Sequence, residues 1–257
     1  MFKKRKRYVA ILVFMALLIG LVAYVHHFVT SISSTAQTAL KSNSLVKVTN
    51  GSQKTVFKPK NGIKRALIYY PGATVTEKGF SYVAQKLAKN KTEVFVVHAP
   101  YYIPLIKMKS LKYGDQIRKQ HPQIKHWFMM GYSQGGRAAS FYLLKTKYKY
   151  DGFILNDSIV SSGKGKSLYQ QRNNFTEPVL AIRGTKDGMF PKNTLKPNHT
   201  YYPKNTQFVA IKGANHSNMT MWNGASKIPG DEKANITKRQ QNNELSNIIT
   251  KFMNQNM

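Results

Sequence analysis

Residues 126–140 decide the fold, and they read His126-Trp-Phe-Met-Met-Gly-Tyr-Ser-Gln-Gly-Gly-Arg-Ala-Ala-Ser140. An apolar strand ends in Gly131-Tyr-Ser-Gln-Gly135 and gives way to small residues that favour a helix. A sharp turn from strand to helix strains the backbone of its middle residue, and glycines two positions before and after it remove side chains that would collide there. We therefore expect Ser133 to stand exposed between a strand and a helix.

A serine presented in this way is typical of enzymes that use it as a nucleophile. The helix that begins at Gln134 points its free N–H groups and the positive end of its dipole at the place where an oxyanion would form. The pattern G-x-S-x-G also arises by chance in loops that contain glycine and serine. The flanking strand and helix, together with an Asp and a His after later strands, favour the catalytic interpretation here.

Strands and helices alternate beyond this stretch and before it, which is typical of a mostly parallel, doubly wound sheet with helices on both faces. The expected strands span residues 66–70, 94–98, 127–131, 152–156, 179–183 and 208–211. The expected helices span residues 80–89, 111–121, 134–145 and 167–172. An Asn50-Gly51 turn predicts a hairpin between strands at 46–48 and 55–57. Thr237 and Gln240 form the pattern of a capping box, and the helix after them should close the sheet.

A serine hydroxyl is a poor nucleophile at neutral pH, so it needs a general base within reach and a carboxylate that orients this base. The strand at 179–183 runs into a loop that contains Asp187, and the strand at 208–211 runs into a loop that contains His216. In a parallel sheet these loops lie at the edge that carries Ser133. We therefore predict a catalytic triad of Ser133, Asp187 and His216.

Asp157 is the alternative acid, because it follows the strand at 152–156. It lies in an Asn-Asp-Ser sequence ahead of a possible helix, where an aspartate is typical of a cap, so we prefer Asp187. The oxyanion would need two backbone donors. We predict the N–H of Gln134, which follows the nucleophile, and the N–H of Ala73, in the Pro71-Gly72-Ala73-Thr74 loop after an earlier strand.

The N-terminal segment carries a separate signal. Residues 1–7 hold a basic cluster, Lys3-Lys-Arg-Lys-Arg7, and an apolar run without a charge follows from Tyr8 to Val25. This run is long enough to span a bilayer, and the basic cluster predicts that the N-terminus stays in the cytoplasm. A cleaved signal peptide is the alternative, but the run is long for one and no Ala-x-Ala site follows. We predict a cytoplasmic tail at 1–7, a transmembrane anchor at 8–29, a polar tether or loosely formed helix at 30–44 and one domain at 45–257.

The charge of the chain limits its partners. The formal net charge is +30, and the basic cluster supplies only five of the 40 Lys and Arg residues, so the domain itself is strongly basic. The remaining basic residues are scattered and form no nucleic-acid-binding motif, so we expect no specific nucleic acid and instead anionic polymers of the cell envelope as partners. The chain has no cysteine, which excludes disulfides, thiolate metal sites and a cysteine nucleophile.

The motifs together resemble the α/β-hydrolase superfamily, and within it the group labelled α/β hydrolase fold-5. The resemblance rests on Leu67-Ile-Tyr-Tyr-Pro-Gly-Ala73, Gly131-Tyr-Ser-Gln-Gly-Gly136, Ile182-Arg-Gly-Thr-Lys-Asp-Gly188, Gly213-Ala-Asn-His216 and the tail Gly230-Asp-Glu-Lys-Ala234. It implies an α/β-hydrolase fold with Ser133, Asp187 and His216 as the triad, and no metal or organic cofactor. Tyr132 and Gln134 depart from the group, in which His and Leu usually flank the serine.

These observations predict a membrane-anchored, extracytoplasmic and monomeric serine hydrolase. About twenty residues separate Asn156 from the next strand, which leaves room only for a minimal lid and predicts small or short-acyl ester substrates. The candidates for the pocket wall are Tyr101, Tyr102, Met189, Phe190 and Trp222. The alternative is a non-catalytic basic surface protein that binds anionic polymers of the cell envelope.

Overall fold

The computed structural model of the chain describes residues 2–102, 112–158, 176–189, 202–203, 206–224, 228 and 230–257. Three expectations fall outside these residues: the helix at 167–172, most of the segment that would form the minimal lid, and Phe190.

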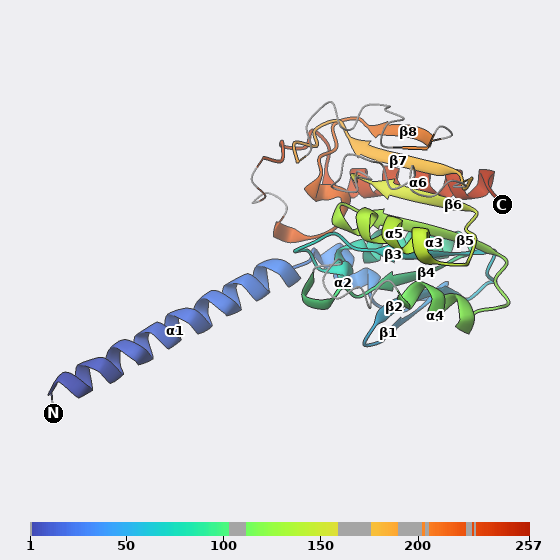
Figure 1. The fold of residues 1–257 in the computed structure, drawn as a ribbon. Helices are drawn as coiled ribbons and strands as arrows, with labels where there is room; N and C mark the ends of the chain where they lie inside the picture. The colour runs from blue at the N-terminus through green and yellow to red at the C-terminus, as the bar shows by residue number, and fades with distance from the viewer. Residues whose placement is uncertain are drawn as a thin grey trace.

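One eight-stranded sheet organises the domain (Figure 1). Its strands follow in the order β1-β2-β4-β3-β5-β6-β7-β8. The hairpin of β1 and β2 is antiparallel, β2 joins β4 in the same way, and the pairs from β4 to β8 are parallel. The predicted mostly parallel sheet is confirmed. The bounds of the strands are Val46–Asn50, Lys54–Pro59, Arg65–Tyr70, Thr92–Val97, His126–Tyr132, Gly152–Asn156, Val179–Gly184 and Thr206–Ile211 for β1 to β8.

Helices cover both faces of the sheet, as predicted. On one face lie α3 (Ser81–Lys89) and α6 (Lys238–Gln255), whose Leu87, Leu245 and Ile249 belong to the core of that face. On the other lie α4 (Lys112–Gln120) and α5 (Gln134–Lys145), whose Ile117 and Leu143 belong to the second core. The capping box of Thr237 and Gln240 is present at the start of α6. Short 3-10 helices span Glu77–Phe80 (η1), Pro100–Tyr102 (η2) and Ser217–Met219 (η4).

The central strands are buried on both faces, because each residue of β3, β4 and β6 lies in the interior. Runs of apolar residues rather than alternating ones are what a doubly covered parallel sheet requires. Each large apolar side chain that is fully buried contributes about 1.5–3 kcal/mol. The sheet is therefore a stable platform, and the loops at its carboxyl edge are positioned by it.

The N-terminal helix α1 (Phe2–Thr30) projects from the domain (Figure 1). By length and composition, Ile11–Thr30 is able to cross a membrane. Its large apolar side chains from Ile11 to Val25 are exposed. A membrane anchor and a signal sequence both have this composition.

Residues 30–44 pack against the domain, which differs from the expected tether or loosely formed helix leaving the membrane. They contain a short helix, α2 (Ser34–Ala39), in which Ala36 and Ala39 are buried against the domain. The Ser81 hydroxyl donates to the Ala36 carbonyl at 2.8 Å. The small alanine side chains let the helix lie close to α3 without the large apolar residues that a sequence pattern would reveal. The segment is thus part of the folded domain.

This packing predicts unequal effects of the same new charge within α2. Ala36→Asp should lower the free energy of unfolding by about 2–4 kcal/mol, because it places an unpaired carboxylate in the interior. Ser34→Asp is the control: Ser34 is exposed in the first turn of the helix, so the change should stay within about 0.5 kcal/mol. Thermal denaturation of the purified variants measures both, and equal effects would mean that residues 30–44 form a free tether.

Candidate active site

Ser133 has the strained backbone that its motif predicts. Its φ is 51° and its ψ is −124°, and it lies between the end of β5 and the start of α5. A Cβ on Gly131 would collide with the backbone of Gly135 and Gly136, and one on Gly135 would collide with the carbonyl oxygens of Tyr70 and Pro71. Only glycine fits at both positions, and the turn leaves Ser133 partly exposed.

The three residues predicted as a triad lie in one chain of hydrogen bonds. The Nε2 atom of His216 is 3.2 Å from Ser133 Oγ, and its Nδ1 atom is 3.1 Å from Asp187 Oδ2. Asp187 and His216 are buried, whereas Ser133 is partly exposed. Loops after three different strands, β5, β7 and β8, thus bring the three side chains together at the carboxyl edge of the sheet.

Asp187 is fixed by a second contact. Its Oδ1 atom accepts a hydrogen bond from the Met189 N–H at 2.8 Å, while Oδ2 faces His216. Because each carboxylate oxygen has its own partner, the side chain has one preferred orientation. The Asp187 carboxylate is therefore directed at the imidazole of His216 by its own loop.

Tyr132, which stands where His is usual in the fold-5 group, contacts His216 through its hydroxyl and its ring. Its hydroxyl donates to the His216 carbonyl at 3.0 Å, and the two rings are 5.1 Å apart. Burial raises the pKa of Tyr132 well above its ordinary value, so the hydroxyl stays a neutral donor. The Tyr132 side chain is buried, so it is not positioned to contact a substrate.

Asp231 connects the two loops that carry Asp187 and His216, and its contacts were not predicted from the sequence. Its carboxylate accepts hydrogen bonds from the His216 N–H at 3.2 Å and from the N–H and hydroxyl of Ser217 at 2.9 and 2.5 Å. It also accepts one from the Gly188 N–H at 3.4 Å. The sequence pointed to Asp231 only through the Gly230-Asp231 pattern of the resemblance. Because Asp231 does not directly follow a strand, its position beside these two loops could not be predicted without the fold.

Gln241 of α6 holds the His216 loop from the other side. Its amide accepts a hydrogen bond from the Asn215 N–H at 3.2 Å and donates one to the Asn215 carbonyl at 2.7 Å. Gln241 is fully buried, so both bonds form away from water. The position of His216 thus depends on the C-terminal segment of the chain as well as on β8.

Asp157 does not orient His216. It also does not act as the expected helix cap, because its side chain contacts the end of β7. It is fully buried with a φ of 40°, and its Oδ1 atom accepts a hydrogen bond from the Gly184 N–H at 2.9 Å. Burial raises the pKa of Asp157 well above its ordinary value, and the charge of Asp187 raises it further.

Asp157, Asp187 and His216 are also the one group in the described part of the chain whose ligand atoms could share a metal ion, since these atoms lie within 4.8 Å of one another. Both ring nitrogens of His216 already have partners, Asp187 and Ser133. A metal ion would have to break one of these hydrogen bonds. The arrangement is better suited to proton transfer.

The two loops predicted to supply oxyanion donors both lie beside Ser133. Gln134 begins α5, and the first N–H groups of a helix have no partner within it. A Cβ on Gly72 would lie 3.5 Å from Ser133 Cβ, so the loop that contains Ala73 passes directly next to the serine. The donor roles of the Ala73 and Gln134 N–H groups stay predictions.

The candidates for the pocket wall fall into different environments. Met189 is 40% exposed and Tyr102 is partly exposed, whereas Trp222 is buried and its indole N–H donates to the Phe28 carbonyl at 2.7 Å. Trp222 is therefore a packing residue. The side chains of Tyr101 and Phe190 lie outside the described part of the structure.

A comparison with models of protein families matches residues 66–243 to the alpha/beta hydrolase family, in the fold-5 group. The chain belongs to this family. The matched region contains Ser133, Asp187 and His216 and extends through Asp231 and Gln241. A comparison with curated proteins found no match.

Solved structures of several hydrolases share the fold. An esterase from Pyrococcus furiosus is 13% identical with a TM-score of 0.58, and the match covers 88% of this chain and 96% of that one. A dienelactone hydrolase from Anabaena variabilis is 12% identical with a TM-score of 0.58, covering 83% and 99%. A soluble variant of monoglyceride lipase from Saccharomyces cerevisiae, solved with a substrate analogue, is 13% identical with a TM-score of 0.57, covering 85% and 97%. At these identities the likeness extends to the fold and no further.

The contacts of Asp231 predict that it positions His216. Asp231→Ala should lower kcat/KM for a small ester by about 100-fold, because a shift of about 1 Å in a catalytic group has an effect of this size. Asp231→Asn, which keeps one acceptor oxygen, should lose less. Glu244→Gln alters an exposed carboxylate of α6 and should leave the rate within about twofold. Steady-state kinetics of folded variants measure these changes, and full activity of Asp231→Ala would contradict the role.

The raised pKa of Asp157 predicts a pH-dependent cost to stability. Above its ordinary value of 3.8, the unfolded chain loses the proton while the folded protein keeps it. Stability should therefore fall as pH rises, by at most about 1.4 kcal/mol per pH unit, up to the raised pKa. Asp157→Asn should reduce this slope to the part that Glu93, whose pKa burial also raises, contributes, whereas Glu244→Gln, at an exposed carboxylate, should leave it unchanged. Denaturation of the chain in detergent between pH 4 and pH 8 tests this, and an unchanged slope in Asp157→Asn would refute it.

Proposed function

We propose that this hydrolase is a serine esterase that works through an acyl-enzyme, with Ser133 as the nucleophile, His216 as the general base and Asp187 as the orienting acid. The observation that carries the proposal is the hydrogen-bonded chain from Ser133 through His216 to Asp187, attached to a serine with a strained backbone. Strain of about 1–3 kcal/mol persists only where the surrounding structure enforces it, and such sites are often functional.

In the first half of the reaction, His216 Nε2 takes the proton of Ser133 Oγ while this oxygen attacks the carbonyl carbon of the ester. The N–H groups of Ala73 and Gln134 stabilise the oxyanion. The tetrahedral intermediate then expels the alcohol, which receives the proton from His216. In the second half, His216 takes a proton from water, the resulting hydroxide attacks the acyl-enzyme, and the acid product leaves as Ser133 regains its proton.

The proposed substrates are esters with a small or short acyl group. The short segment between β6 and β7 supports this choice, because it leaves little chain for a large lid. The fold, shared with an esterase and a lipase, agrees with ester chemistry.

The proposed location is the outer side of the cytoplasmic membrane, with α1 as an uncleaved single-pass anchor and the domain beyond it. The exposed apolar helix and the basic cluster before it support this orientation. The enzyme is proposed to act as a monomer.

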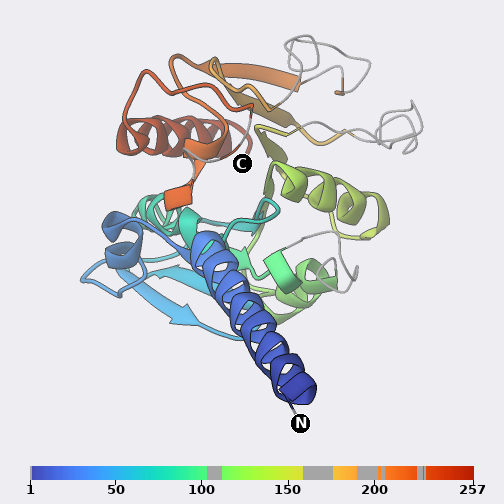
Figure 2. The ribbon, with the colours of Figure 1, turned by 90° about the vertical axis from the view of Figure 1, so that its left-hand side faces the viewer.

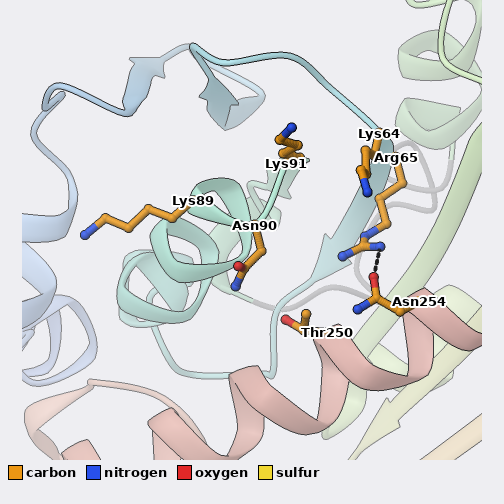
Figure 3. Close-up of a pocket in the computed structure, with 7 residues that line it drawn as sticks. All are labelled: Lys64, Arg65, Lys89, Asn90, Lys91, Thr250 and Asn254. Atoms are coloured by element: carbon orange, nitrogen blue, oxygen red, sulfur yellow. Dashed lines mark hydrogen bonds between the residues drawn. The ribbon is translucent and has the colours of Figure 1, made fainter.

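A second candidate function is the binding of anionic polymers of the cell envelope, and a basic pocket favours it. The pocket has a volume of about 250 Å³ and lies where β3 begins and α6 ends (Figure 3). Arg65 is almost fully buried and donates hydrogen bonds to Thr92 at 3.0 Å and Asn254 at 2.5 Å. No acidic side chain of the described residues lines the pocket. Its basic side chains are Lys64, Arg65, Lys89 and Lys91.

The esterase proposal predicts the effect of removing the nucleophile. Ser133→Ala should reduce hydrolysis of p-nitrophenyl acetate by about 10⁶-fold and abolish labelling by a fluorophosphonate probe. Ser52→Ala, at an exposed serine in the turn between β1 and β2, should change neither. Circular dichroism shows whether the variants fold alike. Unchanged turnover in folded Ser133→Ala would exclude the proposed mechanism.

The binding proposal predicts a specific role for the basic pocket. The chain should be retained on isolated cell envelope at low salt and released at high salt, because exposed charges are screened over about 8 Å at physiological ionic strength. The double variant Lys64→Gln and Lys91→Gln should elute at lower salt than a control that removes the same charge at two exposed lysines near the end of α5, Lys145→Gln and Lys147→Gln. Equal elution of the two variants would exclude a role of the pocket, and salt-independent retention would exclude electrostatic binding.

A further inference from the structure

The C-terminal end of α1 is fastened directly to the domain. The indole N–H of Trp222 donates to the Phe28 carbonyl at 2.7 Å, and the two rings meet edge to face at 5.0 Å. Trp222 is buried, and the partly buried Phe28 packs against the core. The last turn of α1 is therefore held by an apolar contact as well as by a hydrogen bond.

Two more backbone contacts continue this attachment. The Thr76 N–H donates to the Val29 carbonyl at 3.1 Å, and the Asn223 N–H donates to the Ser31 carbonyl at 3.0 Å. The Asn223 side chain adds a bond to the Ser31 hydroxyl at 3.1 Å. With α2 also packed on the domain, no free linker separates α1 from the sheet.

The partners of α1 belong to the two loops that flank the candidate active site. Thr76 follows Ala73 in the loop after β3, and Trp222 follows His216 in the segment after β8. Figure 2 looks onto this edge of the sheet, and α1 extends from it toward the viewer. The helix thus leaves the domain on the side where Ser133 is exposed.

The distance from the apolar part of α1 to this edge is short. The last exposed large apolar residue of α1 is Val25, and Phe28, three residues later, accepts the hydrogen bond from Trp222. Three residues of helix correspond to about 4.5 Å. The polar headgroup layer on each side of a bilayer is about 5–7 Å thick. If α1 spans the membrane, the loops around Ser133 lie at the level of the headgroups.

We infer that the natural substrate is an amphiphilic ester that stays in the bilayer through its apolar part and presents its carbonyl group to Ser133 at the membrane surface. This inference rests on the proposed esterase function and names its substrate class. A short acyl group on an alcohol that is anchored in the bilayer meets both the small acyl site and this geometry. A water-soluble ester would reach the site from the aqueous side without any advantage from the anchor.

The position of the site relative to the membrane can be measured independently of catalysis. The chain has no cysteine, so a single introduced cysteine carries a fluorescent label at one place. Thr74→Cys lies in the exposed part of the loop after β3, and Gln123→Cys lies in the exposed turn before β5, at the opposite edge. In vesicles that contain the full chain and a headgroup quencher, the label at residue 74 should be quenched several-fold more than the label at residue 123. Equal quenching would overturn the inference.

The substrate class is tested with two fluorogenic butyrate esters that share one fluorophore, one of which carries a hexadecyl chain that holds it in the vesicle. A flexible Gly/Ser insertion of ten residues between Val25 and His26 lifts the domain while it keeps the contacts of Phe28, Val29 and Ser31. Relative to the full chain, the insertion should lower the rate for the anchored ester by about tenfold, because the effective concentration of substrate at the site falls. The rate for the soluble ester should stay within about twofold.

The outcomes separate the two proposals. Hydrolysis of neither ester, without labelling by a fluorophosphonate, would remove the esterase function itself. Hydrolysis of the soluble ester with equal rates for the anchored ester in both chains would overturn the substrate class alone.

Discussion

The backbone of Ser133 is the constraint on which the rest of the site depends. A φ of 51° for a residue with a side chain is unfavourable, so the flanking elements have to enforce it. They do so because β5 is buried in the centre of the sheet and α5 packs closely through Gly135 and Gly136. The closeness leaves no space for a Cβ at these glycines. The close packing of α5 on the sheet therefore enforces the turn that leaves the Ser133 hydroxyl exposed.

Polar groups around this hydroxyl are held by a network rather than by single contacts. His216 and Asp187 are buried, and a buried polar group is costly unless its hydrogen bonds are made. Asp231 meets this need by accepting hydrogen bonds from the loops of both residues, and Tyr132 adds a hydrogen bond to the His216 carbonyl. Loops are otherwise the least ordered parts of a domain. The sheet fixes Ser133 directly. The hydrogen-bond network fixes Asp187 and His216, whose loops the sheet alone would not hold in place.

The sequence predicted those features that depend on local pattern. The strands, the elbow and the loops of Asp187 and His216 follow from apolar runs and glycines near one another in the chain. The positions of Asp157 and Asp231 did not follow, because each contacts residues that are distant in sequence, such as Gly184 and His216. The packing of Ala36 was also missed, since a buried alanine leaves no amphipathic pattern. Features that depend on neighbouring residues could be predicted from the sequence, whereas contacts between polar residues distant in the chain could not.

The candidate active site and the basic pocket lie at opposite ends of the same strand. Arg65 begins β3, and Pro71 and Gly72 follow its last residue, Tyr70, next to Ser133. Six residues of strand span about 20 Å, so an anion bound beside Arg65 would not contact the residues around Ser133. The strand between the two sites is buried, and buried charges are screened by salt much less than exposed ones, so it is distance that separates the two sites. The domain is able to face a membrane with one edge and an anionic polymer with the other.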